Sequence, residues 1–383
     1  MRTPSHTAIG TWSGGRYLHF GEPIDVARLE ALLTPGRGLD TLLTADAYGA
    51  GEADRLLGRA LAGTDRDAVC VIGAIGHDFY EGEREGARGY PRFTDPRLRA
   101  GTGSDYADYV RMATERSLER LGIDAFDLLL LHNPDRTGYT SETVWEAMRA
   151  VRDEGLAGRL GIAPGPANGF TLDIIDCLER FGELIDWAMV ILNPLEPWPA
   201  ELCLRAAREH DVKVLTRVID YGGLFWDDVK PGHAFTAGDH RTFRPEGWVD
   251  AGVQKLEQLR PIAERHGLTL LQLAAQWCLA HEPVACVVPT LIQEPGPDAR
   301  TVEAKREELL ATPREIVLDE PEVATIREIG DNTGSMSLKG ADPQHEGEPR
   351  PDRWTLTPDL DAVARRWGIE PDRDLRHLST ARG

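Results

Sequence analysis

The chain has few cysteines, and they lie far apart. Five occur in 383 residues, and no two are spaced as CxxC. This argues against a disulfide framework and against a cysteine-based zinc site, so we expect the thiols to be buried as small apolar groups and no metal to be bound. These cysteines are Cys70, Cys177, Cys203, Cys278 and Cys286.

Long apolar runs and an excess of positive charge are also missing. Nowhere do 18 apolar residues occur together, and the start MRTPSHTAIGTW has no basic segment followed by an apolar one, so we predict no membrane span, no signal peptide and a soluble cytoplasmic protein. The 43 basic residues against 63 acidic ones give a net charge of −20. That balance disfavours nucleic acid and anionic membrane surfaces as partners, and it favours a small-molecule substrate while leaving the oligomeric state open.

What the chain does contain is a regular alternation of short apolar, β-branched runs with helical patterns, which is typical of parallel βα units. Val144, Ala147, Met148 and Val151, for example, recur at helical spacing, and Gly122 follows SLERL as a helix C-terminal glycine would. Eight strands are expected, at Thr7–Gly10, Thr41–Ala45, Val69–Ala74, Leu128–Leu131, Leu160–Ile162, Met189–Leu192, Lys213–Thr216 and Cys286–Val288.

Eight such units predict the α/β class, as a closed (β/α)8 TIM barrel over residues 1–330. An open doubly wound sheet is the alternative, although no GxGxxG follows the first strand. From residue 331 to 383 the composition changes, with a polar stretch rich in glycine and proline. We expect a C-terminal extension there, in which Thr357-Pro358 begins a short amphipathic helix that packs on the barrel.

In a barrel, chemistry gathers where strands end and the following loops begin. Tyr48 follows the second strand, and His132 ends the apolar run LLLLH. Each has a plain alternative, packing for the tyrosine and a hydrogen bond to a backbone carbonyl for the histidine, but together they offer two groups that polarise or protonate a substrate oxygen. The remaining candidates near substrate are Trp12, His77, Asp78, Asn133, Arg217 and Asp220.

Three segments resemble the aldo-keto reductase family in order along the chain, from about residue 5 to residue 330. They are GTW in the first strand, TADAYGAGEADRLLGRAL and LLLLHNPD. The resemblance implies a barrel that binds NADPH and reduces carbonyls with an Asp, Tyr, Lys and His tetrad, in which Tyr48 is the acid and His132 orients the carbonyl. The Asp and Lys positions correspond to Leu43 and Ala74, so those two roles do not carry over.

The positions that would face the cofactor differ as well. GIAP stands where the family tends to show GVSN, which places Ala163 and Pro164 at the nicotinamide amide, and Met189 and Arg217 replace a glutamine and a stacking aromatic ring. Two weaker matches to the residues that bind the 2′-phosphate of NADP(H) remain. They are Thr290 and Arg300.

Three hypotheses follow. The first is an enzyme that acts on a small carbonyl or polyol by redox-neutral proton transfer, such as dehydration, elimination or isomerisation, because acid and base groups persist where cofactor groups do not. His77 and Asp78 are candidates for a replacement base, and Arg217 with Asp220 would either bind an oxyanion or form an ion pair. The second hypothesis is an NAD(P)H-dependent oxidoreductase with an atypical site. The third is a barrel without catalysis that binds a ligand or supports a partner.

The loop HDFYEGEREGARGYPRF after the third strand adds a further pair of alternatives. It would either shape a pocket for a hydroxyl-rich ligand or remain a solvated loop.

Overall fold

The structure is a computed structural model that describes residues 1–383 except 87–88, 100–102, 166–170, 245, 334–355 and 376–383. Eight parallel strands form one sheet in sequence order. They are β1 (Ile9–Gly10), β2 (Thr41–Leu43), β3 (Cys70–Ile75), β4 (Leu128–His132), β5 (Leu160–Ala163), β6 (Trp187–Ile191), β7 (Lys213–Arg217) and β8 (Val284–Val288).

The sheet closes on itself next to β1. Thr7 pairs in parallel with Val287. The amide of Ala8 donates to the carbonyl of Val287 over 3.0 Å, and the amide of Val287 donates to the carbonyl of His6 over 2.9 Å. The predicted (β/α)8 barrel is therefore confirmed, and the doubly wound alternative is wrong. All eight predicted strands are present, with boundaries shifted by up to two residues.

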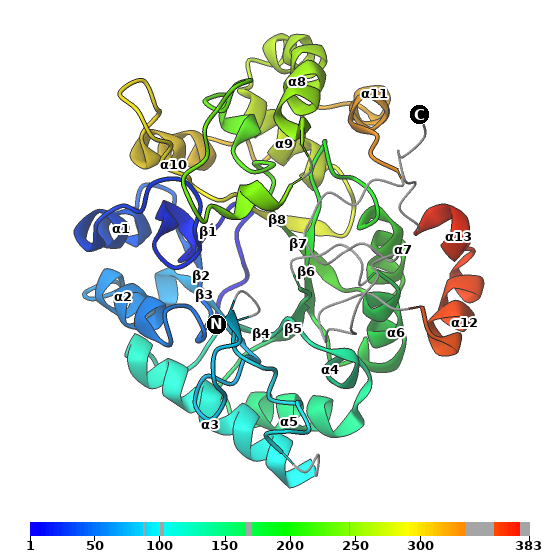
Figure 1. Cartoon of the computed structure of the whole chain (residues 1–383). Helices are drawn as coiled ribbons and strands as arrows, with labels where there is room; N and C mark the ends of the chain where they lie inside the picture. Colours follow the sequence, from blue (N-terminus) through cyan, green and yellow to red (C-terminus); the bar gives the residue numbers. More distant parts are fainter. Residues whose placement is uncertain (87–88, 100–102, 166–170, 245, 334–355, 376–383) are drawn as a thin grey trace.

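Helices surround the sheet (Figure 1). They are α1 (Val26–Leu33), α2 (Glu52–Ala60), α3 (Gly103–Leu121), α4 (Arg136–Thr140), α5 (Glu142–Asp153), α6 (Thr171–Phe181), α7 (Glu201–Glu209), α8 (Trp248–Arg265), α9 (Leu270–Leu279), α10 (Val302–Leu310), α11 (Glu320–Gly330), α12 (Pro358–Trp367) and α13 (Pro371–Asp374). Gly122 follows α3 with φ of 68°, as expected for a C-terminal glycine. No helix of the described residues is long and apolar enough to cross a membrane.

Alternation along the strands separates two apolar cores. In β4, Leu128 and Leu130 belong to a cluster inside the barrel, whereas Leu129 and Leu131 pack with the helices outside it. This is the period of two that strand geometry imposes, and it makes the barrel interior a filled core. Side chains at the carboxyl ends of the strands, just above this core, are therefore left to line the mouth.

The C-terminal helix α12 begins as its sequence predicts. Thr357 accepts a hydrogen bond from the amide of Leu360, and Leu360, Val363 and Ala364 are buried. The helix lies against α6 on the outside of the barrel (Figure 1), where Glu179 of α6 binds both Arg366 and the indole of Trp367. Apolar burial and this polar contact together fix α12 on α6.

Candidate active site

Tyr48 and His132 come together at the mouth of the barrel. Their ring centroids are 5.7 Å apart with the planes at 90°, and Trp12 packs edge-on to Tyr48 with centroids 6.3 Å apart. Gly76 lets the end of β3 approach β4 here, because an added Cβ would lie 2.5 Å from the carbonyl oxygen of His132. The two residues that sequence analysis placed at a substrate oxygen therefore share one site.

Both groups are neutral at physiological pH. Burial raises the pKa of Tyr48 to about 12, and the nearby Arg217 charge opposes that rise. Burial, aided by the charges of Arg217 and Arg92, lowers the pKa of His132 to about 3. His132 Nδ1 has no hydrogen-bond partner among the described residues, so a bond from Nδ1 to a backbone carbonyl does not explain this histidine.

The two residues that the sequence resemblance matches to the Asp and Lys of the family tetrad, Leu43 and Ala74, are apolar and buried. Leu43 and Ala74 belong to the cluster inside the barrel, with exposures of 2% and 7%, and Tyr48 packs against that cluster. Replacing both charged groups leaves no isolated charge in the core, which would otherwise destabilise the fold. Among the described residues, Arg217 is the positive charge that acts on Tyr48.

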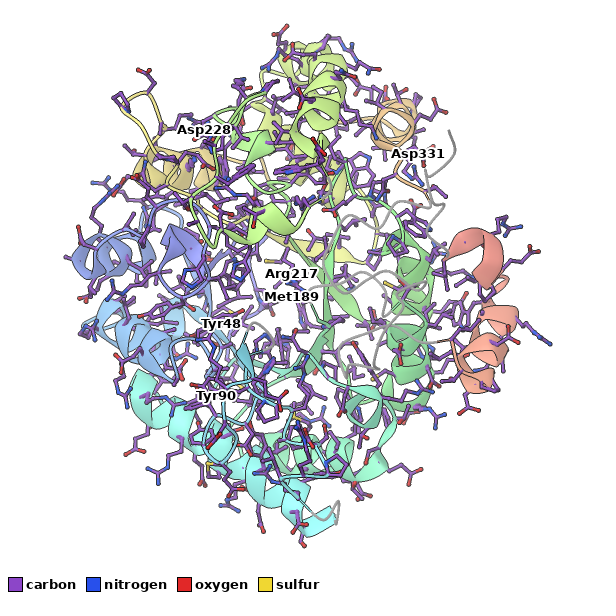
Figure 2. The ribbon with its side chains drawn as sticks, viewed as in Figure 1. Tyr48, Tyr90, Met189, Arg217, Asp228 and Asp331 are labelled. Atoms are coloured by element: carbon purple, nitrogen blue, oxygen red, sulfur yellow. The ribbon has the colours of Figure 1, made fainter. Side chains whose placement is uncertain are left out.

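Arg217 ends β7 and reaches across the mouth towards the segment after β5. Its Nη2 donates to the carbonyl oxygens of Pro164 and Gly165 over 3.0 and 2.7 Å. A small pocket lies beside it, between the ends of β5, β6 and β7. The wall of that pocket is mostly apolar and includes Pro164, Gly165, Ile174, Met189, Ile191 and Arg217. Figure 2 shows Tyr48, Met189 and Arg217 towards the middle of the barrel.

Asp220 does not pair with Arg217. Its carboxylate is fully buried and accepts hydrogen bonds from the amides of Thr290 over 2.7 Å and Gly223 over 3.0 Å. Burial raises the pKa of Asp220 to about 6. The predicted alternative of an ion pair between Arg217 and Asp220 is therefore wrong, and Asp220 joins the loop after β7 to the loop after β8.

His77 lies beside His132, with ring centroids 5.1 Å apart, but both of its nitrogens have partners. Nδ1 is 2.8 Å from the carbonyl oxygen of Tyr90, and Nε2 is 2.8 Å from Nδ2 of Asn133. Because a carbonyl only accepts, Nδ1 carries the proton and the lone pair of Nε2 faces the Asn133 amide. His77 is thus held neutral and is poorly placed to remove a proton from substrate.

Asp78 has a structural role in the loop after β3. One oxygen accepts from the amides of Tyr80 and Glu81 over 3.0 Å each, and the other is 2.6 Å from Arg99. This fully buried carboxylate holds the first turn of the loop, so its geometry does not favour a role as a base. Of the loop HDFYEGEREGARGYPRF, residues 87–88 lie outside the described residues.

Of the two matches to a 2′-phosphate site, Thr290 is engaged through its backbone and Arg300 through its side chain. The carbonyl of Thr290 accepts from the indole of Trp226 over 2.9 Å, in addition to the bond from its amide to Asp220. Arg300 donates to the carbonyl of Trp226 over 2.8 Å and pairs with Glu308. No side-chain hydrogen bond to the amide of a nicotinamide is available from Ala163, Pro164 or Met189. Arg217 is turned instead to the backbone after β5, where it donates to the carbonyl of Pro164. The residues present therefore do not fit a nicotinamide cofactor in the family manner.

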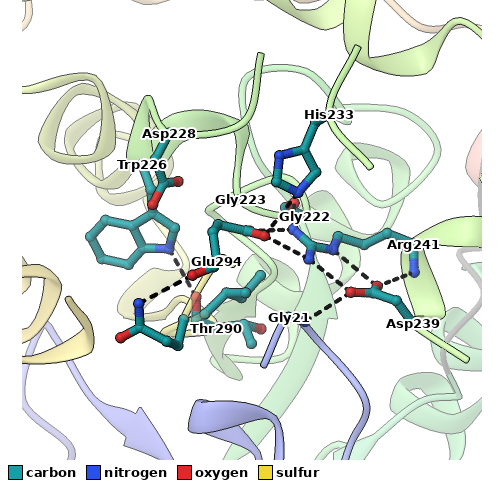
Figure 3. A network of polar contacts seen from close by, with 12 residues as sticks. Gly21, Gly222, Gly223, Trp226, Asp228, His233, Asp239, Arg241, Thr290 and Glu294 are labelled. Carbon is teal, nitrogen blue, oxygen red and sulfur yellow. Dashed lines mark hydrogen bonds and ion pairs between the residues drawn. The ribbon is translucent and has the colours of Figure 1, made fainter. Parts of the chain in front are cut away.

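Sequence analysis missed two features of the mouth. Arg92, in the long loop after β3, donates from Nε to the carbonyl of Asn133 over 2.6 Å and places a second positive charge near His132. The other feature is a buried ion network in which Arg241 binds both Asp239 and Glu294, while Asp239 also accepts from the amide of Gly21 (Figure 3). Neither feature could be read from a local pattern, because Arg92 meets Asn133 across 41 residues, and Asp239 and Arg241 meet Gly21 and Glu294 from other loops.

The network joins three loops at the carboxyl end of the barrel. Gly21 follows β1, Arg241 follows β7 and Glu294 follows β8. Arg241 also donates to the carbonyl of Gly222 over 3.2 Å, and His233 Nε2 lies 3.1 Å from Glu294. These contacts hold the loops around one side of the mouth in a fixed arrangement.

Comparison with known proteins places this geometry in a family. The model of the Aldo/keto reductase family matches residues 8–330. A probable voltage-gated potassium channel subunit beta from Arabidopsis thaliana is 25% identical over 300 residues, which cover 75% of this chain and 84% of that protein. A protein of the same description from Oryza sativa subsp. japonica is 25% identical over 306 residues and covers the same shares.

Solved structures agree on the fold. The glycerol dehydrogenase from Gluconobacter oxydans superposes with a TM-score of 0.66 at 21% identity, covering 86% of this chain and 92% of that chain. The holo form of an aldo-keto reductase from Bacillus halodurans gives a TM-score of 0.59 at 22% identity, covering 85% and 91%. The chain belongs to the aldo/keto reductase family.

Proposed function

We propose that the chain is an enzyme that acts on a small carbonyl or polyol compound by redox-neutral proton transfer, through enolisation followed by isomerisation or loss of water. The observation that carries the proposal is that Arg217 occupies the mouth beside Tyr48 and His132 while Leu43 and Ala74 replace the charged tetrad pair. A phenol, an imidazole and a guanidinium remain around one position, and they suit the stabilisation of a developing enolate.

The roles divide by protonation state. Tyr48, with its pKa raised to about 12, keeps its proton and donates to the substrate oxygen. His132 is neutral, so one ring nitrogen has a lone pair that accepts the proton from the carbon next to the carbonyl. The C–H electron pair then forms the carbon–carbon double bond of the enol. Arg217 stabilises the negative charge on oxygen while the bond forms.

The low pKa of His132 is consistent with this role once substrate is bound. Burial, and then the charges of Arg217 and Arg92, disfavour the imidazolium in the free protein. The negative charge of an enolate offsets the contribution of the two arginines. In a compound with a hydroxyl next to the carbonyl, the imidazolium returns its proton to the former carbonyl carbon while the hydroxyl proton moves to the enolate oxygen, which completes an isomerisation. In a compound with a hydroxyl one carbon further on, the enolate electron pair expels that hydroxyl, which takes the proton from the imidazolium and leaves as water. Each route balances without an electron donor or acceptor.

Proton exchange tests the proposal directly. The protein is incubated in D2O with a panel of short oxo- and hydroxy-compounds and no nicotinamide, and deuterium incorporation is followed by NMR. We expect exchange next to the carbonyl, and its rate should fall about 10²-fold or more in Tyr48→Phe and in His132→Gln. Tyr106→Phe, in α3, is the matched control and should keep the rate. Turnover that appears only after NADPH or NADH is added would overturn the proposal and favour an oxidoreductase.

A second candidate is a barrel that binds a ligand or supports a partner without catalysis. It is favoured by the two plant relatives whose descriptions name them as probable potassium channel subunits. The same NMR experiment separates the candidates, because this one predicts a ligand whose signals broaden on binding and which stays unexchanged over hours.

A further inference from the structure

Arg217 lacks a carboxylate partner in the described part of the chain. Its Nη2 binds two backbone carbonyls, and its Nε is buried without a hydrogen-bond partner. Among the described residues, Glu196 is the carboxylate whose charge acts on Arg217, and that group lies 3.4 Å from Arg244. A guanidinium keeps its proton at neutral pH, so the mouth holds a positive charge that the described residues do not neutralise.

Five other arginines with little side-chain exposure are ion-paired with carboxylates. The pairs are Arg99 with Asp78, Arg120 with Asp54, Arg241 with Asp239 and Glu294, Arg244 with Glu196, and Arg306 with Glu307. Arg217 is partly buried and differs from these five, because the partners of its guanidinium are backbone carbonyls. A charge withdrawn from water is unfavourable without a counter-charge, and this one lies at the site that carries Tyr48 and His132.

The backbone next to Arg217 is strained. Val218 has a φ of 61°, a left-handed conformation that is rare for a β-branched residue, and its carbonyl accepts from Nδ2 of the buried Asn193 over 3.1 Å. Strain of this kind persists where surrounding contacts impose it, and it clusters at functional sites. Here it follows directly after the residue whose guanidinium faces the mouth.

The pocket beside Arg217 restricts what its charge can bind. Apart from Arg217, most side chains in its wall are apolar, among them Ile174, Met189, Ile191 and Ala200. A group that enters must therefore be small and carry its negative charge next to the guanidinium. A carboxylate meets both conditions, because its two oxygens accept from guanidinium N–H groups.

We propose that Arg217 binds the carboxylate of the substrate, so that the substrate is a short oxo- or hydroxy-carboxylic acid whose remaining oxygen faces Tyr48. This rests on the proposed function and names the class of its substrate. The overall charge of −20 repels such an anion at a distance, so recognition depends on the local positive charges of Arg217 and Arg92.

Binding of two matched probes tests the inference. Acetate and acetamide have similar size and shape, and only acetate is charged. Each is titrated into the full chain at pH 7 while the NMR signals of the His132 ring and the Met189 methyl group are followed. We expect acetate to bind at least about tenfold more tightly than acetamide, and to lose that preference in Arg217→Met. Arg111→Met, at an exposed ion pair in α3, should keep it.

Two results of the titration overturn the inference. Equal binding of acetate and acetamide to the unaltered protein does so without any variant, and so does a preference for acetate that survives in a folded Arg217→Met protein. Arg217→Lys should retain part of the preference because it retains the charge.

The inference and the proposed function can fail separately. Acetate binding with no proton exchange in any carboxylic acid refutes the function alone, and exchange only in uncharged carbonyl compounds refutes the inference alone.

Discussion

Asn133 fixes the protonation of His77, because its Nδ2 lies 2.8 Å from the ring Nε2 while the carbonyl of Tyr90 holds Nδ1 at the same distance. Asn133 adopts a φ of 48°, a conformation that asparagine and aspartate tolerate better than most residues. His77 is consequently a neutral spacer next to His132. Burial and the Arg92 charge hold the pKa of His77 well below its usual range.

Asn133→Asp should turn His77 into a titrating group. A carboxylate at the position of the amide favours the imidazolium, and an opposite charge at this distance shifts a pKa by about 1 to 3 units. NMR titration of the His77 ring should show its pKa higher in the variant than in the unaltered protein. Asn133→Ser, which adds no charge, is the control and should leave the titration low. A His77 signal that titrates alike in all three proteins would contradict the assigned hydrogen bonds.

The second prediction concerns the replaced tetrad pair. Ala74→Lys and Leu43→Asp each place a charge in the apolar cluster inside the barrel, so each should lower the free energy of unfolding by about 3 to 5 kcal/mol. If the two charges meet as they do in the family, the double variant should lose less than the sum of the two by about 1 to 3 kcal/mol. Urea unfolding of the four proteins measures this coupling. Simple additivity would show that the two positions no longer face each other.

The strands and the meeting of Tyr48 with His132 could be predicted from sequence because each depends on local order. A strand needs a short apolar run, and the carboxyl ends of parallel strands lie on one rim, so residues that follow β2 and β4 approach each other. The side chain of Arg217 could not be predicted in this way. Its partners, the carbonyls of Pro164 and Gly165, have no side-chain signal, and the expected partner Asp220 is satisfied by backbone amides instead.

The third prediction is a pH effect on stability that comes from His132. Its pKa is about 3 in the folded protein and about 6.5 when exposed, so between these values the unfolded chain binds more protons at this residue. Stability from this group is therefore complete above pH 6.5 and is lost as the pH falls towards 3. From pH 7 to pH 5 the loss is about 2 kcal/mol.

His132→Gln should remove that contribution. The free energy of unfolding, measured with urea at pH 7 and pH 5, should fall by about 2 kcal/mol more in the unaltered protein than in the variant. The difference between proteins isolates His132 from every other group that titrates in this range. Parallel pH dependences for the two proteins would show that His132 does not have the low pKa.

The last prediction concerns the ion network at the mouth. Arg241, with a side chain 1% exposed, neutralises Asp239 and Glu294, which are 0% and 1% exposed. Arg241→Met keeps most of the side-chain volume but leaves two buried carboxylates without that cation, so we expect a loss of about 3 to 5 kcal/mol in unfolding free energy. Arg111→Met removes the exposed ion pair with Glu154 and should lower the unfolding free energy by less than about 1 kcal/mol.

Because the network joins the loops after β1, β7 and β8, hydrogen exchange at the amide of Gly21 should also accelerate in Arg241→Met. A stable Arg241→Met protein with unchanged exchange at Gly21 would mean that burial of the loops, and not this network, holds the mouth in shape.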